Sequence, residues 1–210
     1  MDINRLKRRI CVIGKRMHQR KYISGYDGNI SVRLGNDRIL ITPTGVCKGD
    51  LEPDMLLELG LSGTILDSPG GFSPTSELNM HMDVYSSRED INGIIHAHPI
   101  HATALSLLYF DISTPVLPES LFSFGKIGVA DFAIPTTKAV VDSIKPLLQE
   151  HDAIILKKHG TITFGKDIME SYYRLESLEH TCEIIYKTSV NGKALPLGHD
   201  VIRKIMAIRK

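Results

Sequence analysis

The sequence lacks the features that mark several common classes of protein. Its formal net charge is only +1, which provides no basic field for nucleic acid, so an anionic ligand has to be met by a local site. No apolar run approaches the roughly 20 residues of a membrane-spanning helix. The charged first nine residues are not followed by a cleavable apolar segment. We therefore expect neither nucleic acid nor a membrane as partner, and a cytoplasmic location.

Cysteine is also scarce. The three cysteines, Cys11, Cys47 and Cys182, form no CxxC pair and are odd in number, which argues against a disulfide framework and for a reducing compartment. A length of 210 residues with 42% hydrophobic residues suits one domain with a sizeable core. We expect a single domain over residues 1–210, in which only the tail from about residue 192 is a candidate for flexibility.

The spacing of apolar residues predicts helices and strands that alternate along the chain. Helices are expected over residues 4–21, 76–86, 99–109, 134–150 and 167–187. Strands are expected over residues 30–34, 38–42, 55–59, 64–67, 91–98, 153–157 and 161–164. Because a Gly-x-Gly-x-x-Gly fingerprint is absent, this alternation favours a mixed-sheet α/β domain over a dinucleotide-binding one.

Three histidines stand at the ends of two apolar strands. His96 and His98 are two residues apart, so their side chains project from the same face of a strand. His159 follows the strand 153–157 and precedes Gly160, which permits a sharp turn. Three imidazoles delivered by two strand ends suit a catalytic metal ion, because a fourth position stays free for substrate.

A chain with nine histidines also produces a His-x-His by chance fairly often. His81 and His101 are interpreted as residues that line the pocket or compete as ligands, since His81 is four residues after Glu77 and His101 is three after His98. The remaining histidines have no such context and are interpreted as ordinary residues: His18, His151, His180 and His199.

Glu77 follows Thr75 and Ser76, either of which could cap the helix that is expected to begin there. By frequency alone it is a first-turn glutamate that compensates the helix dipole. Three turn segments are rich in small residues that offer hydrogen-bond donors. They are Gly28-Asn29-Ile30-Ser31, Thr42-Pro43-Thr44-Gly45 and Thr75-Ser76. Each could be a mere turn, but together they could form a nest that holds a phosphate dianion without Arg or Lys.

These segments resemble the class II aldolase/adducin family, and within it the L-fuculose-1-phosphate aldolase branch. The resemblance covers about residues 4–190 and rests on the three turn segments with Glu77, on His96-Ala97-His98-Pro99 and on Lys158-His159-Gly160. It implies a central mixed, mainly antiparallel β-sheet flanked by helices on both faces. It also implies a homotetramer with active sites at subunit boundaries.

The resemblance assigns roles to the site residues. It implies zinc bound by His96, His98 and His159, with Glu77 as a further ligand without substrate and as acid/base with it; cobalt, manganese or iron would also suit three imidazoles. The residues implied to bind the substrate phosphate are Gly28, Asn29, Thr44, Gly45, Thr75 and Ser76.

The implied reaction is metal-dependent retro-aldol cleavage of a ketose 1-phosphate such as L-fuculose 1-phosphate. Its products are dihydroxyacetone phosphate and a short aldehyde such as lactaldehyde. The ion acts as Lewis acid for the developing enediolate, and Glu77 protonates the enediolate carbon. This task favours a carboxyl pKa raised by a partly dry site.

The chain departs from this branch on the aldehyde side. The branch uses a tyrosine from a neighbouring subunit there, but residues 115–120 contain none, and neither do residues 201–210. Glu119 could transfer the same proton or serve a different reaction, whereas Tyr109 is too far upstream to substitute.

Several other functions stay open. Within the family they are a 4-epimerase, a dehydratase or a decarboxylase acting on a sugar phosphate, and the spacing from His98 to His159 counts mildly against the epimerase. Outside these are a Schiff-base aldolase using Lys157 or Lys158, although nothing marks either lysine as desolvated, and a non-catalytic scaffold like the adducin head domain.

Overall fold

The computed structural model describes residues 2–35, 37–108, 111–192 and 194–209. Within them the strands form one eight-stranded sheet in the order β4-β3-β2-β1-β5-β8-β7-β6. Neighbouring strands are antiparallel except for the parallel pair β6 and β7. The strands are β1 (Asn29–Arg33), β2 (Arg38–Ile41), β3 (Leu57–Gly60), β4 (Ile65–Asp67), β5 (Gly93–Ala97), β6 (Gly128–Ala130), β7 (Ala153–Leu156) and β8 (Gly160–Gly165). The expectation of a mixed, mainly antiparallel sheet is confirmed.

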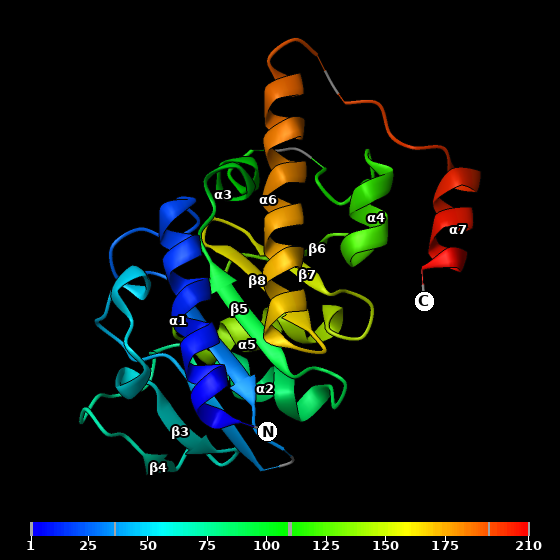
Figure 1. The fold of residues 1–210 in the computed structure, drawn as a ribbon. Helices are drawn as coiled ribbons and strands as arrows, with labels where there is room; N and C mark the ends of the chain where they lie inside the picture. The colour runs from blue at the N-terminus through cyan, green and yellow to red at the C-terminus, as the bar shows by residue number, and fades with distance from the viewer. Residues whose placement is uncertain (1, 36, 109–110, 193, 210) are drawn as a thin grey trace.

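Helices cover both faces of the sheet, as Figure 1 shows for α1 and α6 in front and α2 and α5 behind. The helices are α1 (Ile3–Gln19), α2 (Leu78–Ser87), α3 (Ile100–Ser106), α4 (Pro118–Phe124), α5 (Lys138–Ile144), α6 (Ile168–Ser189) and α7 (His199–Ile208). Consecutive residues of β5 serve the two layers, since Ile94 packs in the α2 and α5 core whereas Ile95 packs against α1 and α6. A strand covered on both faces is apolar throughout, as this one is just before His96.

Several predicted boundaries were wrong for local reasons. The helix expected over 134–150 is only α5 followed by a 3-10 turn, because Pro146 lacks the backbone donor that would continue the α-helix. The helix expected to start at residue 76 starts at Leu78, with Glu77 itself at the N-cap position instead of Thr75 or Ser76. The third helix ends at Ser106, and the part expected at Tyr109 lies outside the described residues.

Three elements were not expected at all. These are α4 and β6, which have seven and three residues, and α7, a ten-residue amphipathic helix whose apolar periodicity was overlooked in the sequence. The last of them occupies part of the tail that was the candidate for flexibility, and it packs on α4. Arg209, just after α7, forms an ion pair of 2.7 Å with Asp152. In the described residues no helix is long and apolar enough to cross a membrane.

Candidate metal centre and anion cradle

The three histidines singled out by the sequence lie together in the structure. His96 is on β5, His98 follows directly after it, and His159 lies in the turn between β7 and β8. The pairing of β5 with β8 places Ala97 opposite Thr161, so the end of β5 meets the β7–β8 turn. One ligating atom from each histidine lies within 4.8 Å of those of the others.

Gly160 allows this approach, although not by bending the chain. A Cβ at this position would lie 2.4 Å from the carbonyl oxygen of Ala97 and 2.6 Å from the His98 ring. The left-handed backbone of the turn is instead at Lys158, whose φ is 59° and whose N–H donates to the Ser106 hydroxyl at 3.0 Å. Glycine is therefore required for close packing of the two strand ends.

Two of the rings are oriented by partners on their outer nitrogens. His96 is fully buried, and its Nδ1–H donates to the Thr161 carbonyl at 2.9 Å, which leaves Nε2 with a free lone pair. Nδ1 of His98 faces a carboxylate oxygen of Asp27 at 3.4 Å. Their Nε2 atoms lie 2.9 Å apart. An outer partner that fixes ring and tautomer is the usual support of a metal-binding histidine.

Glu77 closes the fourth side of this group. Its Oε2 lies 3.0 Å from Nε2 of His96 and accepts the Asn29 amide at 2.9 Å. Its Oε1 is 3.4 Å from Nε2 of His159 and, although buried, has no hydrogen-bond partner among the described residues. Burial acts to raise the pKa of Glu77, but His96 and the Asn29 hydrogen bond outweigh it and hold the pKa well below its usual range. The expectation of a raised pKa was wrong for this arrangement.

The donor set fits a divalent cation. Burial is the largest influence that lowers the pKa of His159 to about 4, and it also lowers the pKa of His98, so these imidazoles are neutral near pH 7. Lone pairs that converge at 2.9 Å repel each other unless a positive charge lies between them. Tetrahedral ligand atoms about 2.05 Å from zinc lie about 3.3 Å from one another. Oε1 of Glu77, which has no hydrogen-bond partner among the described residues, lies at a similar distance of 3.4 Å from Nε2 of His159.

The three polar turn segments also lie together, joined by their backbones. Thr42 N–H donates to the Ile30 carbonyl at 3.0 Å, and Thr75 N–H donates to the Thr42 carbonyl at 3.2 Å. Thr44 N–H donates to the Ser73 carbonyl at 3.0 Å, so the first two strands and the start of α2 share one edge. The segments 28–29, 44–45 and 75–76, which we call the anion cradle, therefore border the metal-binding histidines through Asn29 and Glu77.

The two glycines of the cradle are required for different structural reasons. Gly28 has a φ of 70°, and a Cβ there would lie 2.6 Å from Ile23 and 2.8 Å from the His96 carbonyl oxygen. Gly45 has a φ of 71° but only open space around its missing Cβ. Thr44, Gly45 and Ser76 are exposed, so their polar groups are accessible to a ligand.

The sequence reasoning missed Lys48 and Asp27, which border the cradle. Lys48 is 1% exposed, and its Nζ donates to the carbonyls of Tyr26 at 2.8 Å and Val46 at 2.7 Å. Burial lowers the pKa of this ammonium. A buried lysine thus joins the loop before Gly28 to the loop after Gly45, next to a site that was expected to use no lysine. Asp27 directly precedes Gly28 and Lys48 is three residues after Gly45, so their closeness to these motifs in the sequence could have indicated them.

His81 and His101 are not part of the histidine triad. His81 is fully buried behind Asn29, whose Oδ1 accepts from its ring. The ring of His101 bonds to Glu179, which also accepts the N–H of Ala102 and so caps α3. Glu119 is exposed in the first turn of α4, and its carboxylate has no recorded hydrogen bond within the described ranges. Tyr109 lies outside the described residues.

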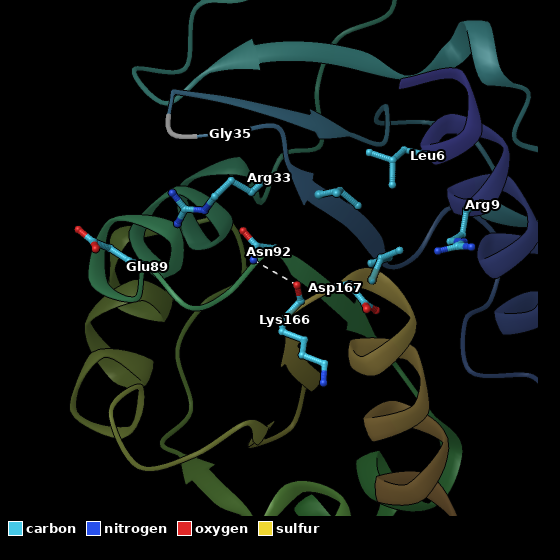
Figure 2. A pocket seen from close by; sticks show the side chains of 10 residues that line it. Leu6, Arg9, Arg33, Gly35, Glu89, Asn92, Lys166 and Asp167 are labelled. Atoms are coloured by element: carbon cyan, nitrogen blue, oxygen red, sulfur yellow. Dashed lines mark hydrogen bonds between the residues drawn. The ribbon is translucent and has the colours of Figure 1, made fainter. Parts of the chain in front are cut away.

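Two other places offer little chemistry. A cavity of about 510 Å³ lies at the opposite end of β1 and β5. Figure 2 shows the side chains that line it. Its Arg33 donates to the carbonyls of Ile91 and Tyr85, and its Asp167 caps α6. Lys157 and Lys158 are exposed rather than desolvated, and Lys157 pairs with Asp131 at 2.7 Å. Neither lysine has the dry environment that a Schiff-base nucleophile requires.

Comparison with known proteins gives the family. The family model of the class II aldolase and adducin N-terminal domain matches residues 8–186, so the chain belongs to this family, as its motifs predicted. The L-fuculose phosphate aldolase of Methanocaldococcus jannaschii is 36% identical over 179 residues, which are 85% of this chain and 94% of the relative. The 3-oxo-tetronate 4-phosphate decarboxylase of Pectobacterium atrosepticum is 29% identical over 186 residues, which are 87% and 84% of the two chains.

Solved structures agree with this assignment. YgbL from Klebsiella pneumoniae, described as a candidate aldolase/epimerase/decarboxylase, has a TM-score of 0.90 and 28% identity, and the match covers 98% of this chain and 99% of that one. The L-fuculose-1-phosphate aldolase of Thermus thermophilus has a TM-score of 0.78 and 29% identity, with 91% and 99% covered. The chain is therefore an enzyme of lyase type in a metal-dependent class, and the scaffold alternative is set aside.

Proposed function

We propose that this enzyme is an aldolase that cleaves a ketose 1-phosphate of the L-fuculose 1-phosphate type. Its products would be dihydroxyacetone phosphate and a short aldehyde such as lactaldehyde. The observation that carries the proposal is the convergence of three imidazoles and the Glu77 carboxylate beside the anion cradle. The 36% identity to an L-fuculose phosphate aldolase supports the substrate class.

The protein's own groups divide the work of binding. His96, His98 and His159 would hold the ion, zinc first and cobalt, manganese or iron as substitutes, with Glu77 as a further ligand before substrate binds. When bound, the ion supplies Lewis acidity toward the oxygens of the ketose. The phosphate would lie against Gly28, Asn29, Thr44, Gly45, Thr75 and Ser76, where backbone and hydroxyl donors meet it and Lys48 adds a buried positive charge.

Proton transfer would divide between two carboxylates. Loss of the proton from the C4 hydroxyl breaks the C3–C4 bond, and the electron pair stays on C3 as the enediolate while the aldehyde leaves. Glu77 would carry a proton to C3, using the Oε1 atom that has no protein partner among the described residues. Glu119 would serve the aldehyde oxygen.

A homotetramer with sites at subunit boundaries would explain the position of Glu119. This residue is exposed on α4, whereas the histidines are held by β5 and the β7–β8 turn. Supplied by a neighbouring subunit, an exposed carboxylate could reach a site that its own chain does not bring it to. We propose that assembly, together with a cytoplasmic location.

Decarboxylation is the second candidate, and one observation favours it. A 3-oxo acid phosphate that loses carbon dioxide leaves the same enediolate of dihydroxyacetone phosphate, so the metal centre and Glu77 serve both reactions. Decarboxylation requires no acid or base at an aldehyde oxygen, and residues 115–120 contain no tyrosine for that role. The 29% identity to a 3-oxo-tetronate 4-phosphate decarboxylase supports it as well.

One experiment distinguishes the two candidates. Metal-loaded protein is incubated with dihydroxyacetone phosphate and a panel of short aldehydes, and in parallel with 3-oxo-tetronate 4-phosphate. An aldolase gives condensation products that EDTA abolishes, whereas a decarboxylase releases carbon dioxide in the second reaction only. Condensation that is unchanged by EDTA would contradict the metal-dependent proposal. If neither reaction gives a product, the result would point to the epimerase or dehydratase activities.

A further inference from the structure

The face of α2 toward β1 carries a continuous polar contact, which we call the α2–β1 seam. The residues of this seam recur every four positions along α2 and every two positions along β1. Two strand residues advance about 6.7 Å and four helical residues advance about 6.0 Å, so the two repeats stay nearly in step over this length. The seam consists of Glu77 at the N-cap of α2, of His81 and Tyr85 on α2, and of Asn29, Ser31 and Arg33 on β1.

The directions of its hydrogen bonds follow from one end. Because the Asn29 amide nitrogen donates to Glu77 Oε2, its Oδ1 must accept, so the proton of His81 is on Nε2. Nδ1 of His81 is then an acceptor, and the Ser31 hydroxyl donates to it at 2.7 Å. The Tyr85 hydroxyl in turn donates to Ser31 at 2.8 Å. Every proton along the seam therefore points toward the site.

We propose that His81, backed by Ser31 and Tyr85, is a positioning residue that fixes the orientation of the Asn29 amide. With this orientation Asn29 donates to Oε2 of Glu77, and Oε1 of Glu77 is left for the substrate. This inference rests on the proposed role of Glu77 as proton carrier. It applies equally to cleavage and to decarboxylation, because both need a proton delivered to the same enediolate carbon.

The seam holds a position and does not relay protons. An amide cannot accept a proton at oxygen and release one from nitrogen without changing its bonding, so Asn29 interrupts any transfer between His81 and Glu77. Ser31 and His81 are 0% exposed and Tyr85 is 1% exposed, so no water competes for their hydrogen bonds. Burial is the largest influence that lowers the pKa of His81, which keeps the ring neutral as this pattern requires.

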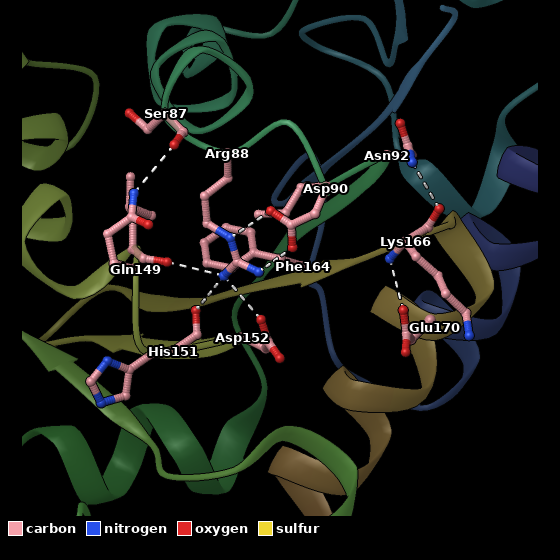
Figure 3. A network of polar contacts seen from close by, with 12 residues as sticks. Ser87, Arg88, Asp90, Asn92, Gln149, His151, Asp152, Phe164, Lys166 and Glu170 are labelled. Atoms are coloured by element: carbon pink, nitrogen blue, oxygen red, sulfur yellow. Dashed lines mark hydrogen bonds and ion pairs between the residues drawn. The ribbon is translucent and has the colours of Figure 1, made fainter. Parts of the chain in front are cut away.

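The far end of the seam is anchored to the rest of the fold. The Arg33 guanidinium lies 4.8 Å from the centre of the Tyr85 ring and donates to the Tyr85 carbonyl at 2.6 Å. Arg88, just after α2, donates to the carbonyls of Leu148 at 3.0 Å and His151 at 3.3 Å, and Figure 3 shows it among its partners. The helix that carries Glu77 is thus fixed beyond the seam as well as along it.

Two variants of similar side-chain length test the proposal in the metal-loaded enzyme. His81→Gln retains a terminal N–H that can donate to Asn29, whereas His81→Met does not. We expect His81→Met to lower kcat by about 10- to 100-fold, the range for lost support of a metal-site group, and His81→Gln to retain most of it. His151→Met removes a hydrogen-bonded histidine outside the seam and should behave as wild type. The loss should decrease in the order His81→Met, Ser31→Ala, Tyr85→Phe.

Folding and metal content are measured for each variant, so that a misfolded protein is not counted as a loss of positioning. Independently of activity, ¹⁵N-histidine labelling should show His81 as the neutral Nε2–H tautomer by nitrogen chemical shift. Equal kcat values for His81→Gln and His81→Met in folded proteins would overturn the proposal, and so would an Nδ1–H or doubly protonated His81. Failure of all substrates with the expected tautomer present would instead count against the proposed function.

Discussion

The two carboxylates that we propose for catalysis lie in contrasting surroundings. The side chain of Glu77 is only 10% exposed beside His96 and His159, and Asn29 holds one of its oxygens. Glu119 is exposed in the first turn of a seven-residue helix, with no recorded partner in the described part of the chain. The groups proposed to hold the metal therefore all come together within one chain, whereas the group proposed for the aldehyde does not join them. The contrast suggests that the family's shared chemistry resides on the metal side, and that the group which leaves is selected on the other.

The largest expected effect is that of Glu77→Gln, because it removes the proton carrier while keeping the shape. General acid–base catalysis typically contributes about 10² to 10⁴, so kcat should fall by about that factor in cleavage. Exchange into D₂O of a proton on the hydroxymethyl carbon of dihydroxyacetone phosphate, which is C3 of the ketose, should also be lost. This half-reaction requires no aldehyde. The exchange is followed by NMR on metal-loaded protein. Normal exchange in a folded, metal-bound variant would remove Glu77 from the mechanism.

Glu119→Gln tests the other side of the comparison. We expect kcat for cleavage to fall by about 10²-fold, at the low end of the same range. The loss is smaller because the groups proposed to hold the metal and Glu77 are unchanged. Exchange of the C3 proton should stay at the wild-type rate. Both rates are measured on the same preparation. If cleavage is unaffected while carbon dioxide is released from the 3-oxo acid phosphate, the decarboxylase is the better assignment.

How much of this could be predicted differs between the two sides. His96 and His98 were predictable because alternation along a strand is a local rule, and His159 because it ends an apolar strand. The cradle was predictable from Gly, Asn, Ser and Thr in turns. The sheet and its layers followed from the periodicity and the family resemblance.

The rest depends on which segments pair in three dimensions. Nothing local marks Lys48 as buried, because its burial results from the packing of its turn against α1. The contact of His81 with Asn29 depends on how α2 lies on β1. The elements α4 and β6 are too short for periodicity to identify, and Glu119 lies on α4. The helix α7 is amphipathic, so its periodicity was a usable signal that the prediction did not take up.

Lys48→Met should have an intermediate effect on the metal side. The methionine fills similar space but leaves the carbonyls of Tyr26 and Val46 without their donor, at a cost of about 1–3 kcal/mol in the free energy of unfolding. With the loops of the cradle no longer joined, KM for the phosphorylated substrate should rise more than kcat falls. Lys48→Arg is the control for charge. Steady-state kinetics and urea unfolding check both effects, and an unchanged KM would show that Lys48 only supports the fold.

The smallest expected effect is on stability in acid, measured on metal-free protein. Burial lowers the pKa of His81 to about 3 and that of His159 to about 4, both below the usual 6.5. Between pH 6.5 and 4 the unfolded chain therefore binds protons that the folded chain does not, so the free energy of unfolding decreases as pH falls, by roughly 1 kcal/mol per pH unit for each group. His81→Gln should make this slope shallower by one group in urea unfolding at several pH values. Because both histidines lie on the metal side, Glu119→Gln should leave the slope between about pH 6.5 and 5 nearly unchanged. An equal change in both variants would refute the idea that acid sensitivity is confined to the buried side of the site.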